Sequence, residues 1–238
     1  MIKTYFRLYR RFLSIDLVNS LRKEGRNDKI IFDFFKTLIV LVKKDNSSEN
    51  KNQSLNDLEE IILEYEKIYN TPHRFKIHQS LTNEDKFDIN NFMKYFPEII
   101  KTNILNELAY SIALFQKLSI NEEFESNLIS NKISGLHLQS IIEFNNAISH
   151  IHKCYSSNKD IEGNIKKAII HLYRGVLDIY KTLILHKKGT FSSQEILDLT
   201  NLRLLEVHNI GESIEFKKQD NSIINKYKEL IKKLYKIT

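Results

Sequence analysis

Residues 161–187, "IEGNIKKAIIHLYRGVLDIYKTLILHK", decide the fold class. Apolar residues recur along this stretch at intervals of three and four, at Ile161, Ile165, Ala168, Leu172, Val176, Ile179 and Leu183. That spacing follows the period of an α-helix and predicts one long amphipathic helix. Gly (6) and Pro (2) are scarce in the chain of 238 residues. Sandwiches and barrels draw on both for their many tight turns, so we predict an all-α fold.

The flanking sequence predicts three more helices. An apolar stripe runs over 136–155, before the long helix. After it, the capping box "SSQE" (192–195) opens a helix that ends near Gly211. The segment "NSIINKYKELIKKLYKI" (221–237) forms the last helix. Four helices joined by short loops predict a C-terminal four-helix bundle over 136–238.

The remaining chain, 1–133, is predicted to be a second helical region. Residues 3–23 and 29–44 form a helical hairpin, 45–54 form a polar loop, and a helix starts at Ser54. The alternating "HRFKIH" (73–78) is a candidate strand. Further helices are expected from Pro97 and from the capping box at 119–122.

The segment 30–42, "IIFDFFKTLIVLV", is apolar on almost every side of its helix. Such a helix is buried in a core, against a partner or in a dimer interface. We expect a homodimer or a protein partner rather than a monomer. The segment is shorter than the roughly 20 residues of a membrane span, so we predict none.

Composition indicates a soluble protein of the cytoplasm. A single cysteine, Cys154, excludes an internal disulfide and a Cys-rich zinc site. Charges interrupt the first residues, which lack the apolar stretch of a signal peptide. No Gly-rich phosphate loop occurs, and we predict no cofactor.

The net charge of +6 is concentrated at the two ends of the chain. Residues 1–29 and residues 217–238 each carry +5, and the middle carries −4. Two basic ends that meet in space would form a surface for RNA or DNA, whereas solvated helix faces are the simpler explanation. The candidate binding residues are Arg7, Arg10, Arg11, Lys232 and Lys233.

Arg203 and His208 are the candidate catalytic residues. A helical projection places Arg203 among Ile196, Leu199 and Val207, with Glu206 one turn on. A guanidinium in apolar surroundings must be paired, so Arg203 either forms a structural ion pair or lines a pocket.

The C-terminal helices with "RLLEVH" (203–208) resemble the HEPN superfamily in size, helix number and the R-x4-H spacing. The chain has Leu204 where that superfamily usually has a polar residue. The resemblance implies a metal-independent endoribonuclease, a toxin or antiviral effector, with its site at a dimer interface. His208 would be the general base on a ribose 2′-hydroxyl, and Arg203 would stabilise phosphate charge.

Two other polar groups are candidate sites. His171, Arg174 and Asp178 share a polar stripe with Lys167 and Lys181, and Arg174 can pair with Asp178. The stripe is either a solvent face or a seam that contacts a phosphate or a partner. The second group, "SHIHKC" (149–154), matches no strong zinc pattern, and we predict no metal site.

Two function classes follow from the sequence. We favour a helical module of a bacterial-type cytoplasmic system, which binds nucleic acid through its basic ends or docks onto a partner protein. The alternative is the HEPN-like endoribonuclease.

Overall fold

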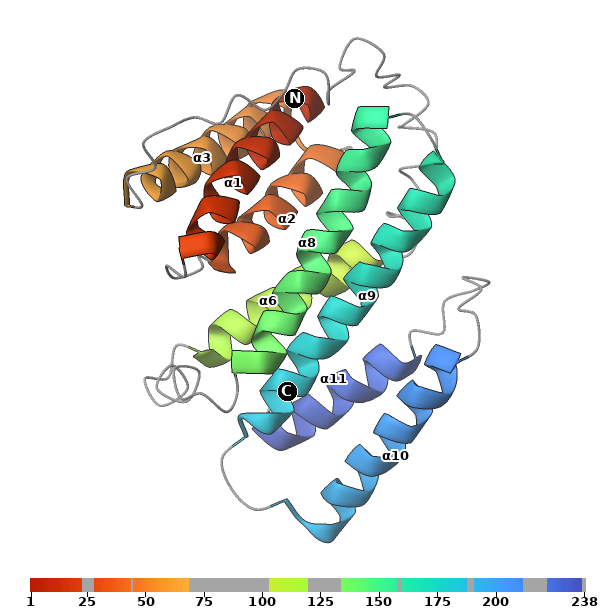
Figure 1. Cartoon of the computed structure of the whole chain (residues 1–238). Coiled ribbons are helices and arrows are strands. Elements are labelled where there is room, and N and C mark those ends of the chain that lie inside the picture. The colour runs from red at the N-terminus through yellow and green to blue at the C-terminus, as the bar shows by residue number, and fades with distance from the viewer. Residues whose placement is uncertain are drawn as a thin grey trace. The chain divides into compact units, whose positions relative to one another are not determined.

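The computed structural model describes residues 1–22, 28–43, 45–68, 103–119, 134–157, 160–187, 191–211 and 222–236. Every regular element in these ranges is an α-helix (Figure 1), which confirms the all-α prediction. The helices are α1 (Ile2–Arg22), α2 (Asp28–Val42), α3 (Ser48–Ile68), α6 (Ile104–Ser119), α8 (Ser134–Ser157), α9 (Ile161–Leu185), α10 (Ser193–Gly211) and α11 (Ser222–Tyr235). None of them is long and apolar enough to cross a membrane. The candidate strand at 73–78, the helix start at Pro97 and residues 120–122 lie outside the described residues.

The chain forms two compact units. The first comprises Met1–Lys101 with Phe144–Ile169, and the second comprises Thr102–Glu143 with Ile170–Thr238. Helices α8 and α9 each contribute residues to both units. The four-helix bundle over 136–238 therefore stays a prediction.

Helix α2 forms the core of the first unit. Its buried residues are Ile30, Ile31, Phe34, Phe35, Leu38 and Leu41. The ring of Phe34 meets Tyr5 and Phe12 of α1. The ring of Phe35 meets Phe144 of α8. The chain itself covers these residues of α2, and the predicted homodimer or protein partner stays a prediction.

Helix α3 begins at Ser48, earlier than the predicted start at Ser54. The hydroxyl of Ser47 accepts a hydrogen bond from the backbone N–H of Asn50 at 3.1 Å, which is the bond of a helix N-cap. Glu49 lies in the first turn, where a negative charge favours the helix dipole. Most of this polar stretch is exposed, so its helix carries no apolar pattern that the sequence could reveal.

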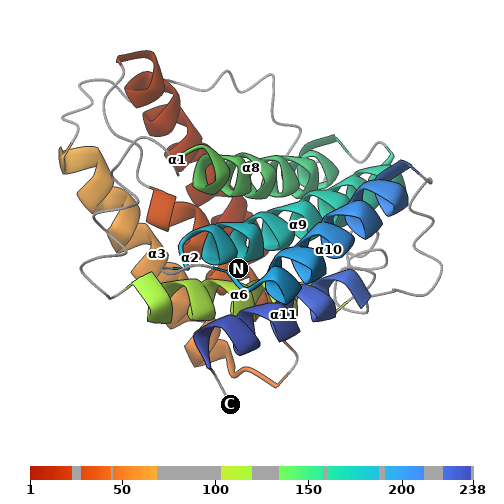
Figure 2. The same cartoon turned by 90° about the horizontal axis from the view of Figure 1, so that it is seen from below.

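Helix α11 is the most regularly amphipathic helix of the second unit. It buries Ile223, Ile224, Tyr227, Leu230, Ile231 and Leu234. Figure 2 shows α11 beside α10 and α6. The ammonium of Lys228 donates to both carboxylate oxygens of Glu107 in α6 at 3.0 Å. The hydroxyl of Tyr235 donates to the carbonyl of Leu183 in α9 at 2.7 Å.

Candidate functional site

Helix α10 carries the predicted motif and begins at the predicted capping box. The backbone N–H of Ser192 donates to the carboxylate of Glu195 at 2.8 Å. In return the N–H of Glu195 donates to the hydroxyl of Ser192 at 3.3 Å. This reciprocal pair fixes the first turn of the helix. The helix ends at Gly211, as predicted.

Arg203 does not lie on a buried apolar face, which corrects our prediction. Its side chain is 47% exposed, and its guanidinium pairs with Glu206 one turn on. The predicted neighbours Ile196 and Val207 are exposed as well. The projection identified the neighbours of Arg203 correctly, but it could not tell which side of α10 packs against the protein. That side holds Leu202 and Glu206.

Glu206 anchors α10 through a network of charged and polar groups. It is only 4% exposed. Its carboxylate accepts hydrogen bonds from Lys181 of α9 at 3.0 Å and from the Tyr227 hydroxyl of α11 at 2.8 Å. Burial raises the pKa of Glu206, but the bonds from Tyr227 and Lys181 outweigh it and hold the pKa below its usual value. Glu206 therefore stays ionised and joins three helices.

Asp178 is the second acid of this network. Its carboxylate pairs with the ammonium of Lys181 at 2.6 Å. Burial raises the pKa of Asp178 above its usual value, although Lys181 acts in the opposite direction. Lys181 thus lies between two buried carboxylates. The two carboxylates compensate the charge of this largely covered ammonium.

The surface of α10 that points away from the network is apolar. We define the outer face as Ile196, Leu197, Leu204 and Val207, whose side chains are 55, 51, 63 and 61% exposed. These positions and Thr200 fall on one side of the helix by its 3.6-residue period. Arg203 borders the outer face on one side. These four side chains form an exposed apolar cluster on the described part of the second unit.

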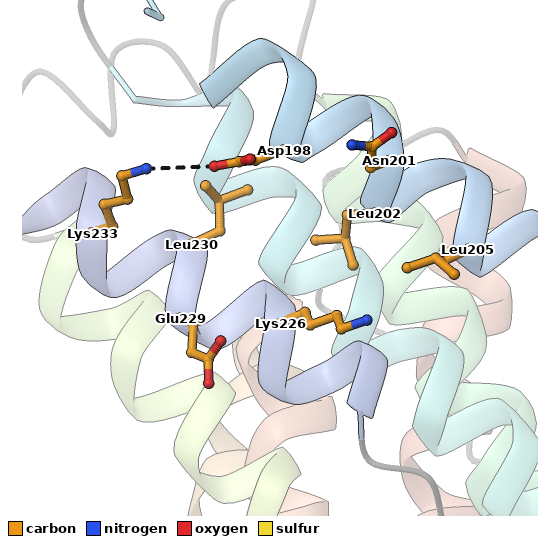
Figure 3. Close-up of a pocket in the computed structure, with 8 residues that line it drawn as sticks. All are labelled: Asp198, Asn201, Leu202, Leu205, Lys226, Glu229, Leu230 and Lys233. Atoms are coloured by element: carbon orange, nitrogen blue, oxygen red, sulfur yellow. Dashed lines mark hydrogen bonds and ion pairs between the residues drawn. The ribbon is translucent and has the colours of Figure 1, made fainter. Parts of the chain in front are cut away.

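A groove lies between α10 and α11 (Figure 3). Its volume is about 350 Å³. Leu202 and Leu230 are buried in its floor, and Leu205 is 40% exposed beside them. The rest of the lining is polar: Asp198, Asn201, Lys226, Glu229 and Lys233. Lys233 and Asp198 form an ion pair at 3.4 Å across the groove.

The predicted stripe on α9 does not form as expected. Asp178 is buried and pairs with Lys181, whereas Arg174 is exposed. Within the described residues no ion pair joins Arg174 to Asp178. His171 is half-buried, and its Nδ1 lies 2.5 Å from the carboxylate of Glu143 in α8. The stripe is therefore split between a buried seam and a solvent face.

The side chain of His208 lies outside the described residues, although its backbone belongs to α10. The geometry between His208 and Arg203 therefore stays a prediction. The carboxylate of Glu206 already engages the Arg203 guanidinium.

The N-terminal cations have different surroundings, although all lie on α1. Arg7 is exposed. Arg11 forms ion pairs with Glu59 and Glu66 of α3. Arg10 is half-buried, and burial lowers the pKa of its guanidinium. Arg11 is thus committed to an internal contact.

The C-terminal cations Lys232 and Lys233 are exposed on α11. They belong to the second unit, whereas Arg7, Arg10 and Arg11 belong to the first.

The His–Cys segment is part of the core of the first unit. Cys154 is fully buried, and burial raises the pKa of its thiol to about 12. A thiol in that state is inert. His150 Nδ1 lies 3.0 Å from the side-chain oxygen of Asn164. Burial, with a smaller effect of Arg10, lowers the pKa of His152 to about 4. Across the described ranges, no three His, Cys, Asp or Glu residues are placed to hold a metal ion.

Comparisons with protein-family models, curated proteins and solved structures gave no match.

The sequence analysis missed the outer face and the groove. The signal was present in "EILDLTNLRLLEV" (195–207), where apolar residues occur on all sides of the helix. A helix of that kind has more apolar surface than one packed face can cover.

Proposed function

We propose that the protein is a helical docking module that binds a partner protein on the outer face of α10. The observation that carries this proposal is the exposure of Ile196, Leu197, Leu204 and Val207 on a helix that is otherwise anchored. Capping and the Glu206 network hold α10 in place. The apolar residues of the outer face are therefore not needed to attach the helix.

The outer face would supply part of the free energy of binding. Full burial of a large aliphatic side chain is worth about 1.5–3 kcal/mol. Half of each of the four side chains remains to be covered, which gives about 1 kcal/mol for each. Together they would supply about 4 kcal/mol before the costs of association. The remainder of the binding energy would come from the contacts that surround these four side chains.

The chemistry of the outer face favours a protein over a nucleic acid. Nucleic acids are held by cations that contact phosphates, and none of the four outer-face residues is charged. Arg203, which borders the outer face on α10, is paired with Glu206. A water-excluding apolar centre with a polar border is the usual anatomy of a protein interface.

A photo-crosslinking residue at position 204 tests the proposal in cells. We expect a crosslinked partner from position 204 and none from Asn225, an exposed position on α11. The purified partner should bind wild type and the variant Leu185→Glu, since Leu185 is an equally exposed leucine at the end of α9. It should not bind the double variant Leu197→Glu/Leu204→Glu. Equal binding by both variants contradicts the proposal.

RNA cleavage separates docking from the HEPN-like alternative. The docking module leaves RNA intact, in wild type and in His208→Ala alike, with a chelator present. Cleavage by wild type that is lost in His208→Ala would replace the docking proposal with the nuclease.

Binding of nucleic acid through the basic ends is a second candidate. The exposed cations Arg7 and Lys232, which have no ion pair in the described part of the chain, favour it. It predicts binding that weakens as salt rises and that is reduced by Arg7→Gln or Lys232→Gln. Salt-independent or absent binding at low salt would remove this candidate.

A further inference from the structure

The groove between α10 and α11 is built from one matched face of each helix. Helix α10 contributes positions 198, 201, 202 and 205, and α11 contributes positions 226, 229, 230 and 233. Both sets follow the one-turn spacing of a helix face. Asp198 meets Lys233, whereas Leu205 and Lys226 lie at the opposite end in Figure 3. The two helices therefore run antiparallel along the groove.

The two ends of the groove differ in charge pairing. At one end the ammonium of Lys233 and the carboxylate of Asp198 neutralise each other. At the other end α10 offers Leu205 in place of an acid. Glu229 extends away from the Lys226 ammonium in Figure 3. Lys226 is exposed, and within the described residues no carboxylate pairs with it.

The floor of the groove suits a large apolar side chain. Leu202 and Leu230 are buried, and the partly exposed Leu205 lines the same space. The volume of about 350 Å³ is at the small end of the range for ligand pockets. A space of that size takes one or two side chains of a partner rather than a large cofactor.

The groove adjoins the outer face of α10. Leu205 follows Leu204 directly, and Asn201 lies one turn after Leu197. A segment that covers the outer face would therefore reach the rim of the groove. An amphipathic helix is the usual occupant of an apolar groove of this kind, because its side chains at one-turn spacing provide the anchors.

We infer that the groove binds an amphipathic helix of the partner protein. A large apolar residue of that helix fills the space above Leu202 and Leu230. An Asp or Glu one turn away pairs with Lys226 and completes the charge pairing that α10 lacks at this end. This inference rests on the proposed docking function and specifies the chemistry of the partner.

An array of stapled helical peptides of about 15 residues tests the inference without knowledge of the partner. Each peptide carries one apolar stripe. The anchor position is Leu, Phe or Ala, and the position four residues later is Glu, Gln or Lys. We expect peptides with Leu or Phe and Glu to bind best. An Ala anchor should weaken binding about tenfold, and Lys in place of Glu should weaken it about fivefold.

The variant Lys226→Glu should reverse the preference from Glu to Lys at the second position. Lys232→Glu makes the same charge change on the same helix outside the groove lining, so it should leave the preference unchanged. Both lysines are exposed, and urea unfolding of each variant would show that the fold is intact.

The outcomes separate this inference from the docking function. Equal effects of Lys226→Glu and Lys232→Glu, or no effect of the anchor, overturn the inference. Docking itself survives in that case if Leu197→Glu/Leu204→Glu still abolishes partner binding. If no peptide binds and the chain forms a dimer that Leu205→Glu dissociates, the inference of a partner helix is overturned. The groove would then bind a second copy of this chain. Both proposals are overturned if no peptide binds and if Leu197→Glu/Leu204→Glu does not change the binding of any partner.

Discussion

Helices α10 and α11 lie side by side in one unit but distribute their apolar residues in opposite ways. Helix α11 buries its apolar face and exposes lysines. Helix α10 directs Leu202 and the acid Glu206 inward and exposes four large apolar side chains outward. The apolar residues of α11 thus stabilise the fold, whereas those of the outer face of α10 do not.

This difference separates, within one helix pair, the apolar residues that stabilise the fold from those that the proposed docking would use. Helix α11 is attached mainly by its buried apolar residues, whereas α10 is attached by Leu202 and by the hydrogen bonds of Glu206 to Lys181 and Tyr227. A helix attached in the second way can keep an apolar face free for a partner. Three changes test the difference, from the largest expected effect to the smallest, and acid titration provides a further test.

Removal of apolar volume from α11 should have the largest effect. We expect Ile231→Ala to lower the free energy of unfolding by about 2–5 kcal/mol, because Ile231 is fully buried. Leu204→Ala on α10 should change it by about 0.5 kcal/mol or less. Urea unfolding measures both. Similar losses in the two variants would contradict the comparison.

Loss of the Glu206 charge should have the next largest effect. Glu206→Gln keeps the shape of the side chain but leaves Lys181 with one carboxylate instead of two. We expect a loss of about 1–3 kcal/mol in the free energy of unfolding. Glu229→Gln is the matched control on α11, because Glu229 is exposed. No difference between the two variants would mean that Glu206 does not anchor α10.

Acid should weaken the attachment of α10 through Glu206. The pKa of Glu206 is lower in the folded than in the unfolded state. The contribution of the ionised Glu206 to the free energy of unfolding is therefore complete above the unfolded-state pKa of about 4.3. It is lost as pH falls through the pKa of Glu206 in the folded state. The stability difference between wild type and Glu206→Gln should shrink over that range.

The effect of acid on Asp178 should have the opposite sign. Burial raises the pKa of Asp178 in the folded state. The stability of wild type relative to Asp178→Asn should therefore rise as pH falls, and parallel curves would contradict both shifts.

The capping box of α10 should have a smaller effect. Ser192→Ala removes the hydroxyl that accepts from the Glu195 N–H and should cost about 1 kcal/mol. Hydrogen exchange in the first turn of α10 should become about fivefold faster as a result. Ser193→Ala is the control. Equal exchange rates in the two variants would show that the cap does not hold the helix.

The sequence predicted the helices that follow a regular apolar pattern or end at a recognisable cap. The spacing in α9, the box at Ser192 and the stop at Gly211 were sufficient for that. It did not predict the start of α3 at Ser48, because the first turns of that helix are exposed and polar.

The candidate site was less accessible to sequence analysis. Spacing along one helix predicted a pair between Arg174 and Asp178, whereas Asp178 pairs with Lys181. The bond from Lys181 to Glu206 connects two helices. Contacts of that kind depend on how helices pack, and local spacing does not encode it. The same holds for Arg203, because a projection gives the neighbours on a helix but not the side that is covered.

The most direct measurement is the free energy of unfolding of Leu197→Glu/Leu204→Glu beside wild type in urea. Glutamate keeps helix propensity close to that of leucine, so the comparison reports mainly on burial. We predict a change of about 1 kcal/mol or less, because exposed substitutions each change stability by about 0.5 kcal/mol or less. A loss of about 3 kcal/mol or more would contradict the central claim. The outer face of α10 would then be part of the core rather than a surface for a partner.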